Sequence, residues 1–437
     1  MASELLKTFQ KIEKGRLKCI EKSTESGYPL PEDASLEQIA YCIDAQTHAS
    51  EYHADYKAFI TRDFSSLPDG VLRLPNDITK LGTYALYRVR CSGIIWPDNI
   101  KTIGDYAMES SSVGKDLDIP NTVTTIGSYA LQAANTGYAI NVPSSVTKMG
   151  TNSFYRSSTY NNVLNYDGRA SSIPERCFGG GSGGAKAYVN FTEEAAEAVT
   201  SIGNYAFNYT ELNRLPFNPD KLTSISATDT FSYCTVPELF TWPHQCKTIQ
   251  GLSDAYLDGG LIIPEGPTSV GRYSLDGTKI RNDDLIFPST ITNVAERAFQ
   301  GTIRQTTDKD TNSYFNKMEF LNTGNLSFGP GAFVNCKTNE LIFHCATMSL
   351  QYNATNVFSH QYVGDIIFLN LMEPISSTNS IFNASYMSST GSYLYLPDDI
   401  VAAAKTIAPW KTIASYIKPL SQWSKYNDYK DQLLPRE

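Results

Sequence analysis

A nine-residue motif recurs along the chain at steps of 22 to 23 residues, and this repetition limits what the chain can fold into. The copies are Ile78–Leu86, Ile100–Met108, Val123–Leu131, Val146–Phe154, Val199–Phe207 and Ile291–Phe299, with a looser copy at Val270–Leu275. Each accompanies a short apolar segment that ends at a proline, as at Pro75, Pro97, Pro120 and Pro143. A period of this length is typical of the coil of a solenoid, in which each coil packs on its neighbours.

The residues of one unit predict how a coil is built. The segments before proline, such as Leu117–Ile119 and Ile140–Val142, alternate between two faces as a strand does. Proline ends each strand because it has no N–H for the next ladder bond. The glycine of the motif allows a tight bend, and the Ala-Phe or Ala-Leu pair fills the interior. The sequence therefore predicts a mainly β fold, a parallel solenoid with short helices.

The consensus I-x-x-I-G-x-x-A-F-x-x-C, followed by L-x-I-P, resembles the BspA-like leucine-rich repeats, over residues 65–397. The resemblance implies a leucine-rich-repeat solenoid, and it places Cys234 and Cys336 at a core position. The copies degrade between Tyr155 and Ala198 and again after Thr302. We expect insertions or irregular loops in those two stretches.

The two ends of the chain differ from the repeats. Residues 1–64 are predicted to form a helical module, since apolar residues recur at helical steps and Ser35–Gln38 forms a capping box. The stretch Gly27–Ile43 resembles a segment near the start of bacteriophage virion proteins, although Leu30 replaces the usual valine. That resemblance implies docking to other virion proteins. Residues 398–437, with Val401–Ile417, are predicted to form a helical cap over the last coil.

Charge and composition exclude several classes of protein. Lys plus Arg is 36 and Asp plus Glu is 45, a net charge of −9, and no basic stripe is present for nucleic acid or a membrane surface. The longest strongly apolar run, Ile366–Met372, is too short to insert in a membrane. The start lacks a signal-peptide pattern, so we expect assembly in a cytoplasm. The 8 cysteines have no C-x-x-C spacing and are predicted to be free thiols.

No pattern of catalytic residues emerges from the sequence. Gly179–Lys186 is not a phosphate loop, because its lysine does not directly follow a glycine and no hydroxyl residue comes next. Cys336, His344 and Cys345 match no standard zinc spacing. Acidic pairs such as Asp283–Asp284 occur where turns are expected. We therefore predict a protein that is not an enzyme, with no catalytic residue, no cofactor and no metal.

Two surface features are candidates for binding. The middle residue of each strand should point outward; the early ones, such as Arg73, Asp118 and Asn141, are mostly polar. From Ile262 onward the middle residues are apolar, at Ile262, Ile286, Ile342, Ile367 and Tyr395. A parallel sheet that is apolar on both faces is covered on both, either by the loops after Thr302 or by another subunit. The second feature is a tyrosine at one repeat position, Tyr84, Tyr106, Tyr129 and Tyr205. These tyrosines either form a recognition stripe or pack laterally between coils.

These observations predict a non-enzymatic structural or adhesive component of a bacteriophage virion, of fibre or decoration type on head or tail. Residues 1–64 would attach to other virion proteins, and the solenoid would bind a host-surface glycan or protein. A homo-oligomer, trimer or dimer, is expected because such elements form closed symmetric assemblies. The alternative is a leucine-rich-repeat adhesin of a bacterial cell surface.

Overall fold

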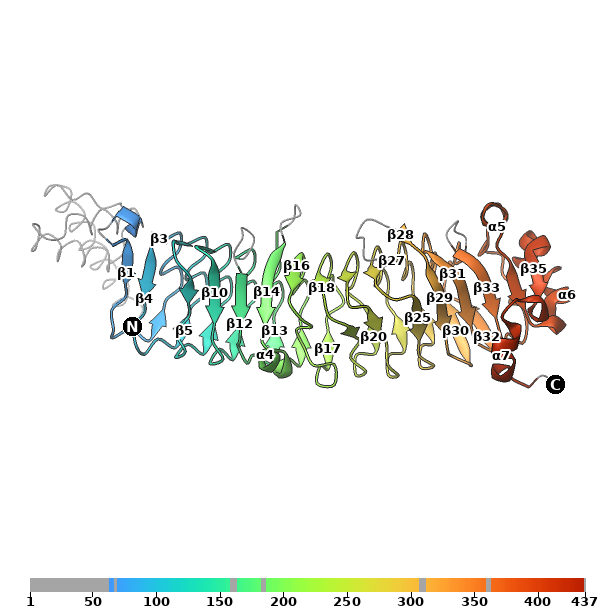
Figure 1. Ribbon diagram of the computed structural model, residues 1–437, viewed down its shortest axis with the longest axis horizontal. Helices are drawn as coiled ribbons and strands as arrows, with labels where there is room; N and C mark the ends of the chain where they lie inside the picture. The colour runs from blue at the N-terminus through green and yellow to red at the C-terminus, as the bar shows by residue number, and fades with distance from the viewer. Residues whose placement is uncertain are drawn as a thin grey trace, which may run out of the picture.

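The computed structural model describes residues 63–66, 69–157, 163–181, 186–305, 312–358 and 363–435. Within these ranges the chain forms one elongated stack of coils, from β1 at one end to a group of short helices at the other (Figure 1). The predicted parallel solenoid with short helices is confirmed. The predicted helical module at 1–64, with the phage-like stretch Gly27–Ile43, lies outside the described residues except for its last two positions.

Each coil contributes short strands to as many as three faces of the stack. One row of strands, many of which end just before a proline, forms what we call the proline face: β1 (Val71–Arg73), β4 (Gly93–Ile95), β7 (Leu117–Asp118), β10 (Ala139–Val142), β12 (Val163–Tyr166), β14 (Ala187–Phe191), β19 (Phe240–Thr241), β22 (Leu261–Ile262), β25 (Asp284–Phe287), β29 (Phe315–Phe320), β31 (Thr338–Phe343), β33 (Val363–Phe368), β34 (Leu394–Leu396) and β35 (Ile417–Pro419). Strand β16 (Thr210–Leu212) joins this row to the third face, because it pairs with β14 and with β18 (Thr235–Val236).

The chain returns through a second row, the return face: β2 (Lys80–Leu81), β5 (Thr102–Ile103), β8 (Thr125–Ile126), β11 (Lys148–Met149), β13 (Ser172–Ile173), β15 (Ser201–Ile202), β17 (Ser224–Ile225), β20 (Thr248–Ile249), β23 (Ser269–Val270), β26 (Asn293–Val294), β30 (Asn325–Phe328) and β32 (Thr347–Leu350). The third face holds β3 (Arg90–Cys91), β6 (Ser112–Val113), β9 (Asn135–Thr136), β18 (Thr235–Val236), β21 (Tyr256–Leu257), β24 (Lys279–Ile280), β27 (Ile303–Gln305) and β28 (Asn312–Ser313). Among the described strands all pairs are parallel except the hairpin β27–β28.

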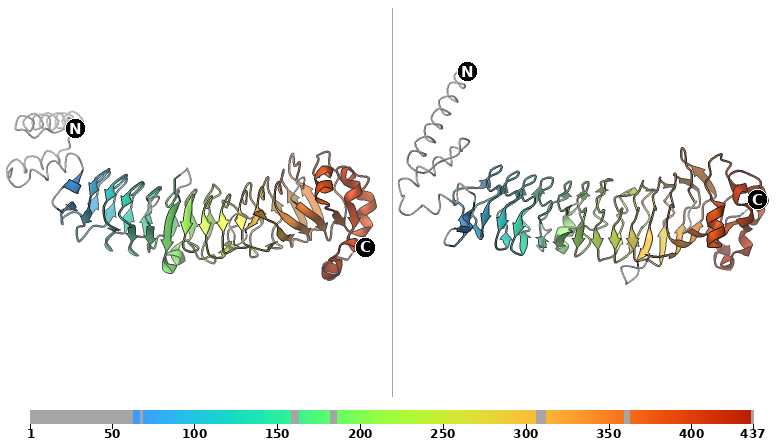
Figure 2. Two further views of the ribbon diagram at one scale, coloured as in Figure 1. Left: turned by 45° about the horizontal axis from the view of Figure 1, so that its top comes forward. Right: turned by 90° about the horizontal axis from the view of Figure 1, so that it is seen from above.

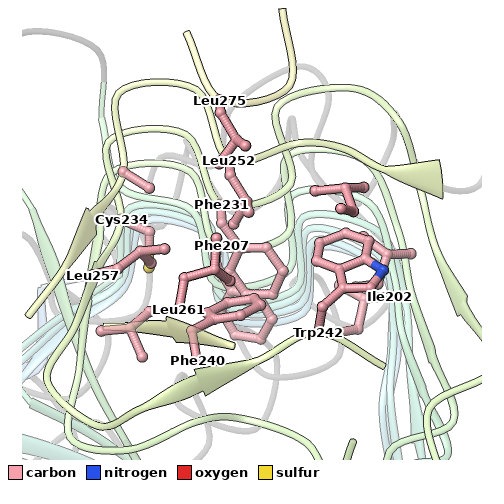
Figure 3. Packing of buried hydrophobic residues seen from close by; sticks show 14 of the residues in the cluster. Ile202, Phe207, Phe231, Cys234, Phe240, Trp242, Leu252, Leu257, Leu261 and Leu275 are labelled. Atoms are coloured by element: carbon pink, nitrogen blue, oxygen red, sulfur yellow. The ribbon is translucent and has the colours of Figure 1, made fainter. Parts of the chain in front are cut away.

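Apolar side chains from all three faces meet on the axis of the stack. Phe207 and Phe231, from the Ala-Phe position of successive coils, stack with ring centroids 5.3 Å apart (Figure 3). Trp242 is fully buried, and its indole N–H donates to the carbonyl of Cys246 at 3.0 Å. Cys234 and Cys336 are completely buried, so the predicted core position is confirmed for both.

The bend of each coil is made differently from the prediction. The tyrosine after the glycine takes the left-handed conformation, with φ of 59° at Tyr84, 55° at Tyr106 and 58° at Tyr129. Its N–H donates to a carbonyl of the next coil, as Tyr106 does to Ser128 at 2.9 Å. The glycine of the motif is needed for close approach instead: a Cβ at Gly150 would lie 2.3 Å from the backbone nitrogen of Ser128. Thus the glycine sets the spacing of coils and the tyrosine sets the turn.

The two degraded stretches keep the coil pattern. Between 155 and 198, β12 pairs in register with β10, β14 pairs in register with β12, and the insertion is a short helix, α4 (Glu193–Ala198), capped by Thr192. After Thr302 the hairpin β27–β28 is followed by the long regular strands β29, β31 and β33. An irregular stretch expected after Thr302 is present as well, because residues 369–383, between β33 and the next helix, contain neither helix nor strand.

The C-terminal region contains short helices as predicted, but it also extends the sheet. After η1 (Phe64–Ser66) at the other end, the remaining helices are α5 (Ala384–Thr390), η2 (Asp398–Ile400), α6 (Val401–Ala404), η3 (Trp410–Tyr416), η4 (Leu420–Gln422), α7 (Tyr426–Tyr429) and η5 (Lys430–Gln432). They gather at the C-terminal end of the stack (Figure 2). Trp410 is fully buried against Phe382, and β35 pairs in parallel with β34, so this region adds a strand and closes the core.

Candidate functional site

The side chains that point outward from the middle of the proline-face strands follow one another along the stack, in several separately paired groups of strands, and we call them together the outward row. Strand register places these residues opposite one another from coil to coil, for example Asn141 beside Asn165 and Ile342 beside Ile367. The described members are Arg73, Ile95, Asp118, Asn141, Asn165, Asn190, Thr241, Ile262, Ile286, Glu319, Ile342, Ile367, Tyr395 and Lys418. The row has a polar, an apolar exposed and a covered section.

The polar section is a chain of side-chain hydrogen bonds, which we call the asparagine ladder. Asn141 Nδ2 donates to Asp118 Oδ1 at 2.6 Å. Asn165 Nδ2 donates to Asn141 Oδ1 at 2.8 Å, and Asn190 Nδ2 donates to Asn165 Oδ1 at 3.0 Å. The ladder lies at the surface, with Asp118, Asn165 and Asn190 exposed. Each amide uses one N–H and each accepting oxygen one lone pair, so hydrogen-bonding capacity remains on every coil.

The ladder ends because the next asparagine is turned to the backbone. Asn213 Oδ1 accepts from the N–H of Phe191 at 2.8 Å, and Asn213 Nδ2 donates to the carbonyl of Phe191 at 3.1 Å. This side chain therefore imitates the backbone of a further strand, and its ladder-forming donor and acceptor are turned to the backbone of Phe191 instead of to Asn190. Asn282 does the same for Leu261, at 2.7 and 3.0 Å.

An open hollow of about 720 Å³ lies over the ladder and the residues that follow it in each strand. Pro143, Asp167 and Thr192 line it beside the ladder. Burial would raise the pKa of Asp167, but hydrogen bonds from Thr192, at 2.6 Å, and Arg169, at 2.7 Å, outweigh it and lower that pKa. Asp167 is thus an ion-paired carboxylate, and Asp118 is the exposed acid at the other end.

Asp118 and Asn141 are the middle residues of the predicted strands Leu117–Ile119 and Ile140–Val142 and point outward as expected, whereas Asn165 and Asn190 were not predicted. These two lie in the degraded stretch, which lacks the Gly-x-Tyr motif by which the other coils were recognised. A usable signal was present: asparagine stands between apolar residues in Ile140–Val142, Leu164–Tyr166 and Val189–Phe191, at steps close to one coil. A search for strands instead of turns would have found the ladder.

The apolar exposed section consists of Ile262 and Ile286, which are 47% and 36% exposed. No described residue covers them, so the outward apolar prediction holds at these two positions. Whether a partner covers them stays a prediction.

The covered section corrects the prediction for Ile342, Ile367 and Tyr395. These three are buried in one cluster with Leu420, Trp423 and Tyr429 from residues 420–433, which we call the capping segment. Of the two alternatives, cover by the chain's own residues after Thr302 holds at these three positions, and short helices of the capping segment supply it instead of irregular loops. Asn370 fixes the segment, since its Oδ1 accepts from the N–H of Leu434 at 2.7 Å. These three residues are not available to a partner.

The four repeat-position tyrosines do not form one stripe. Tyr84, Tyr106 and Tyr129 stack, with centroids 4.8 and 4.7 Å apart. Tyr205 stands apart, with the guanidinium of Arg176 4.6 Å from its ring centroid. Because the stacked rings cover one another's faces, the geometry is that of lateral packing between coils, and a recognition role stays a prediction.

Comparison with known proteins agrees with this architecture. The family model described as the BspA type leucine rich repeat region matches residues 64–183, 162–256 and 259–354. The chain belongs to the BspA-type leucine-rich repeat family.

Two solved structures are similar to this BspA-type chain. A leucine rich cell surface protein from Faecalibacterium prausnitzii A2-165 is 11% identical, with 82% of this chain and 89% of that chain covered and a TM-score of 0.28. A leucine-rich repeat protein from Bacteroides ovatus ATCC 8483 is 12% identical, with 80% and 83% covered and a TM-score of 0.33. The comparison with curated proteins found no match.

Charged side chains lie between the last BspA-type coils and the capping segment. Glu319 is buried, and its two oxygens meet His344 Nε2 at 2.8 Å and Lys317 Nζ at 2.6 Å. Lys317 Nζ also donates to the hydroxyl of Tyr429 at 3.1 Å, and Lys425 Nζ lies 2.6 Å from Glu340. Burial would raise the pKa of Glu319, but the hydrogen bonds from His344 and Lys317 outweigh it and lower that pKa. This network holds the capping segment in place.

The substitution Glu319→Gln tests this network through its pH dependence. Since the folded-state pKa of Glu319 lies below its ordinary 4.5, its stabilisation is present above that pH and is lost as the pH falls through the lowered pKa. We expect the variant to be less stable at neutral pH by about 1.5–3 kcal/mol. The difference from the native chain should shrink toward about pH 3. Urea unfolding at both pH values measures it.

The exposed Glu373→Gln is the matched control, expected to have no effect at either pH. A destabilisation by Glu319→Gln that is equally large at neutral and acidic pH would contradict the assignment.

Within the described ranges, no three His, Cys, Asp or Glu side chains are grouped so that they could hold a metal ion. The same part of the chain contains no helix with the length and apolarity that a membrane span requires. The six described cysteines are buried and unpaired, and desolvation raises their pKa, to about 11 for Cys91. These thiols are therefore poor nucleophiles.

Proposed function

We propose that this protein is a non-enzymatic adhesive and structural component that binds other surfaces through the uncovered part of its outward row. The observation that carries this proposal is the contrast within that row. Its last section is sealed by the capping segment, whereas the stretch from Asp118 to Ile286 is left open on an elongated, rigidly stacked scaffold. The closed C-terminal end favours attachment through the opposite end of the stack, where η1 and β1 lie.

The proposal is tested with the fluorescently labelled full chain and intact bacterial cells. Saturable binding, displaced by an excess of unlabelled chain, is the expected result. Absence of saturable binding to any host tested would contradict the adhesive role. Release of reducing ends from cell-wall or capsular glycans by the purified chain would contradict the non-enzymatic role.

The place of action is proposed from the N-terminal sequence. The resemblance of Gly27–Ile43 to a segment of bacteriophage virion proteins favours a virion component, docked to other virion proteins through residues 1–64. The alternative, an adhesin on a bacterial cell surface, uses the same solenoid in the same way. Mass spectrometry of purified particles, beside surface proteolysis of intact producing cells, separates the two: enrichment in particles supports the virion, and protease-sensitive protein on cells supports the alternative.

Self-association, as a dimer or trimer, is proposed through Ile262 and Ile286. Two neighbouring isoleucine side chains on a sheet face are exposed to water, and burying this apolar surface against another subunit is favourable.

The double substitution Ile262→Lys with Ile286→Lys is expected to shift the full chain to a smaller mass in light scattering. The melting temperature should change little, because both side chains already face solvent. The matched control is Ile95→Lys, which is 49% exposed on the same row but far from the pair. An unchanged mass together with a lowered melting temperature would show that the pair is covered within its own chain.

A further inference from the structure

The asparagine ladder presents the same chemical groups on successive coils, and the hollow beside it is open to solvent. We propose that this hollow binds an extended, uncharged oligosaccharide whose sugar units follow the ladder along the axis of the stack. The inference rests on the proposed adhesive function and names the class of ligand for one part of the outward row.

The hydrogen-bonding inventory matches hydroxyl groups. After the ladder bonds are made, Asn141, Asn165 and Asn190 each keep one free N–H, and each oxygen keeps at least one lone pair. A donor and an acceptor therefore stand side by side on each coil. A sugar hydroxyl both donates and accepts, so it can satisfy both groups at once. Because the amides are held by one another, their orientation is fixed before a ligand arrives, which lowers the entropy cost of binding.

The spacing favours a glycan over an extended peptide. Neighbouring strands lie ~4.8 Å apart, so the amide pairs recur at that interval, which is close to the length of one pyranose unit in an extended glycan. In an extended β-1,4-linked glycan successive units are turned over, so like groups recur every second unit and meet every second coil. In an extended peptide they recur every second residue, ~6.8 Å apart, and would lose register with the ladder after one or two coils.

The charge of the site selects an uncharged ligand. The ladder amides are neutral, Asp167 is ion-paired to Arg169, and Asp118 is an exposed carboxylate at the ladder's end. An anionic glycan would meet Asp118 and a chain of net charge −9, so repulsion opposes it.

Apolar groups stand on both sides of the ladder. Pro143 lines the hollow on one side. On the other, Tyr188 is 43% exposed and points to the same side of β14 as Asn190, two residues away. A pyranose ring has C–H faces as well as hydroxyl edges, and this combination of amides with flanking proline and tyrosine offers a surface for each.

The experiment is titration calorimetry of the full chain with cellohexaose, mannohexaose and chitohexaose. A heparin-derived hexasaccharide and a glycine-serine hexapeptide serve as the anionic and peptide comparisons. Asn165→Leu removes the central amide while keeping its volume. The matched control is Asn325→Leu, an exposed asparagine on strand β30 that donates to Ser349 at 3.0 Å, away from the hollow. Melting temperatures establish that the variants fold, and Asn190→Leu replaces Asn165→Leu if the latter does not.

We expect at least one neutral hexasaccharide to bind, with affinity about tenfold weaker for Asn165→Leu and unchanged for Asn325→Leu. Equal affinity in both variants, stronger binding of the anionic sugar or of the peptide, or no binding of any neutral hexasaccharide would each overturn the inference. If the labelled chain binds cells saturably while the neutral sugars fail, the adhesive function stands and only the glycan assignment is lost.

Discussion

Replacing Phe333 by alanine is expected to lower the free energy of unfolding by about 3–5 kcal/mol, the range for removing a large aromatic side chain from a core. Phe333 is fully buried in the aromatic column of the C-terminal coils. Its ring centroid lies 5.2 Å from that of Phe299 in the preceding coil and 5.8 Å from that of Phe358 in the following one. The substitution therefore opens a cavity between two coil interfaces, and a stack of nearest-neighbour contacts has no other element that can fill it.

Urea unfolding followed by circular dichroism measures this effect. The control is Tyr352→Ala, which removes an aromatic side chain that is 91% exposed and is expected to change stability by less than about 0.5 kcal/mol. Because solenoids can unfold in segments, a second transition in the Phe333 variant is compatible with the prediction, whereas an unfolding curve that coincides with that of the control would contradict it.

Replacing Gly150 by alanine is expected to lower the stability of the stack strongly. Overpacking a core costs roughly 1–3 kcal/mol when neighbouring side chains can move aside, and we expect Gly150→Ala to cost more than this. The added Cβ would lie 2.3 Å from the nitrogen of Ser128 and 2.6 Å from the carbonyl carbon of Gly127, both in the preceding coil. Neither atom belongs to a side chain that can rotate away. The two coils would have to separate, and the backbone hydrogen bond from Gly150 to Ile126, 2.9 Å long, would be stretched with them.

The equivalent glycine of the first repeat provides a control with the opposite sign. A Cβ at Gly82 would meet no atom within 4 Å, and its φ does not lie in the left-handed region. Gly82→Ala is therefore expected to raise stability by about 0.4–1 kcal/mol, because alanine reduces the entropy of the unfolded chain. Thermal melting of the two variants beside the native chain decides the matter. Equal effects at both positions would show that the glycine serves the turn and not the approach of coils.

The sequence was sufficient to predict the architecture because the information for it is repeated. The alternation before each proline and the Ala-Phe pair recur in many coils, so the repeat pattern can be recognised although some copies are degraded. It was misleading about the glycine, because a Gly-x-Tyr sequence does not tell which residue takes the left-handed conformation. Tyr106 and Tyr129 take it, held by their N–H bonds to the next coil.

The exposure of the outward row could be predicted only in part. Alternation in the strands predicted that Ile262 and Ile286 are exposed, which is correct. The same pattern predicted exposure of Ile342 and Ile367, which are buried. Local pattern cannot distinguish these pairs, because what differs is a segment more than 50 residues later in the chain. Leu420 and Trp423 cover the second pair and leave the first exposed.

The repeat sequence was enough to specify the coil, with its length, its strands, its inward side chains and the stacking of one coil on the next, because these depend on residues within one repeat. Tertiary structure alone decided which outward side chains act together. Asp118, Asn141, Asn165 and Asn190 are each separated by a whole coil in the chain, and they form a ladder only because strand register brings them into hydrogen-bonding distance. A surface of this kind is made of equivalent positions on different coils, so its chemistry exists only after the coils have stacked.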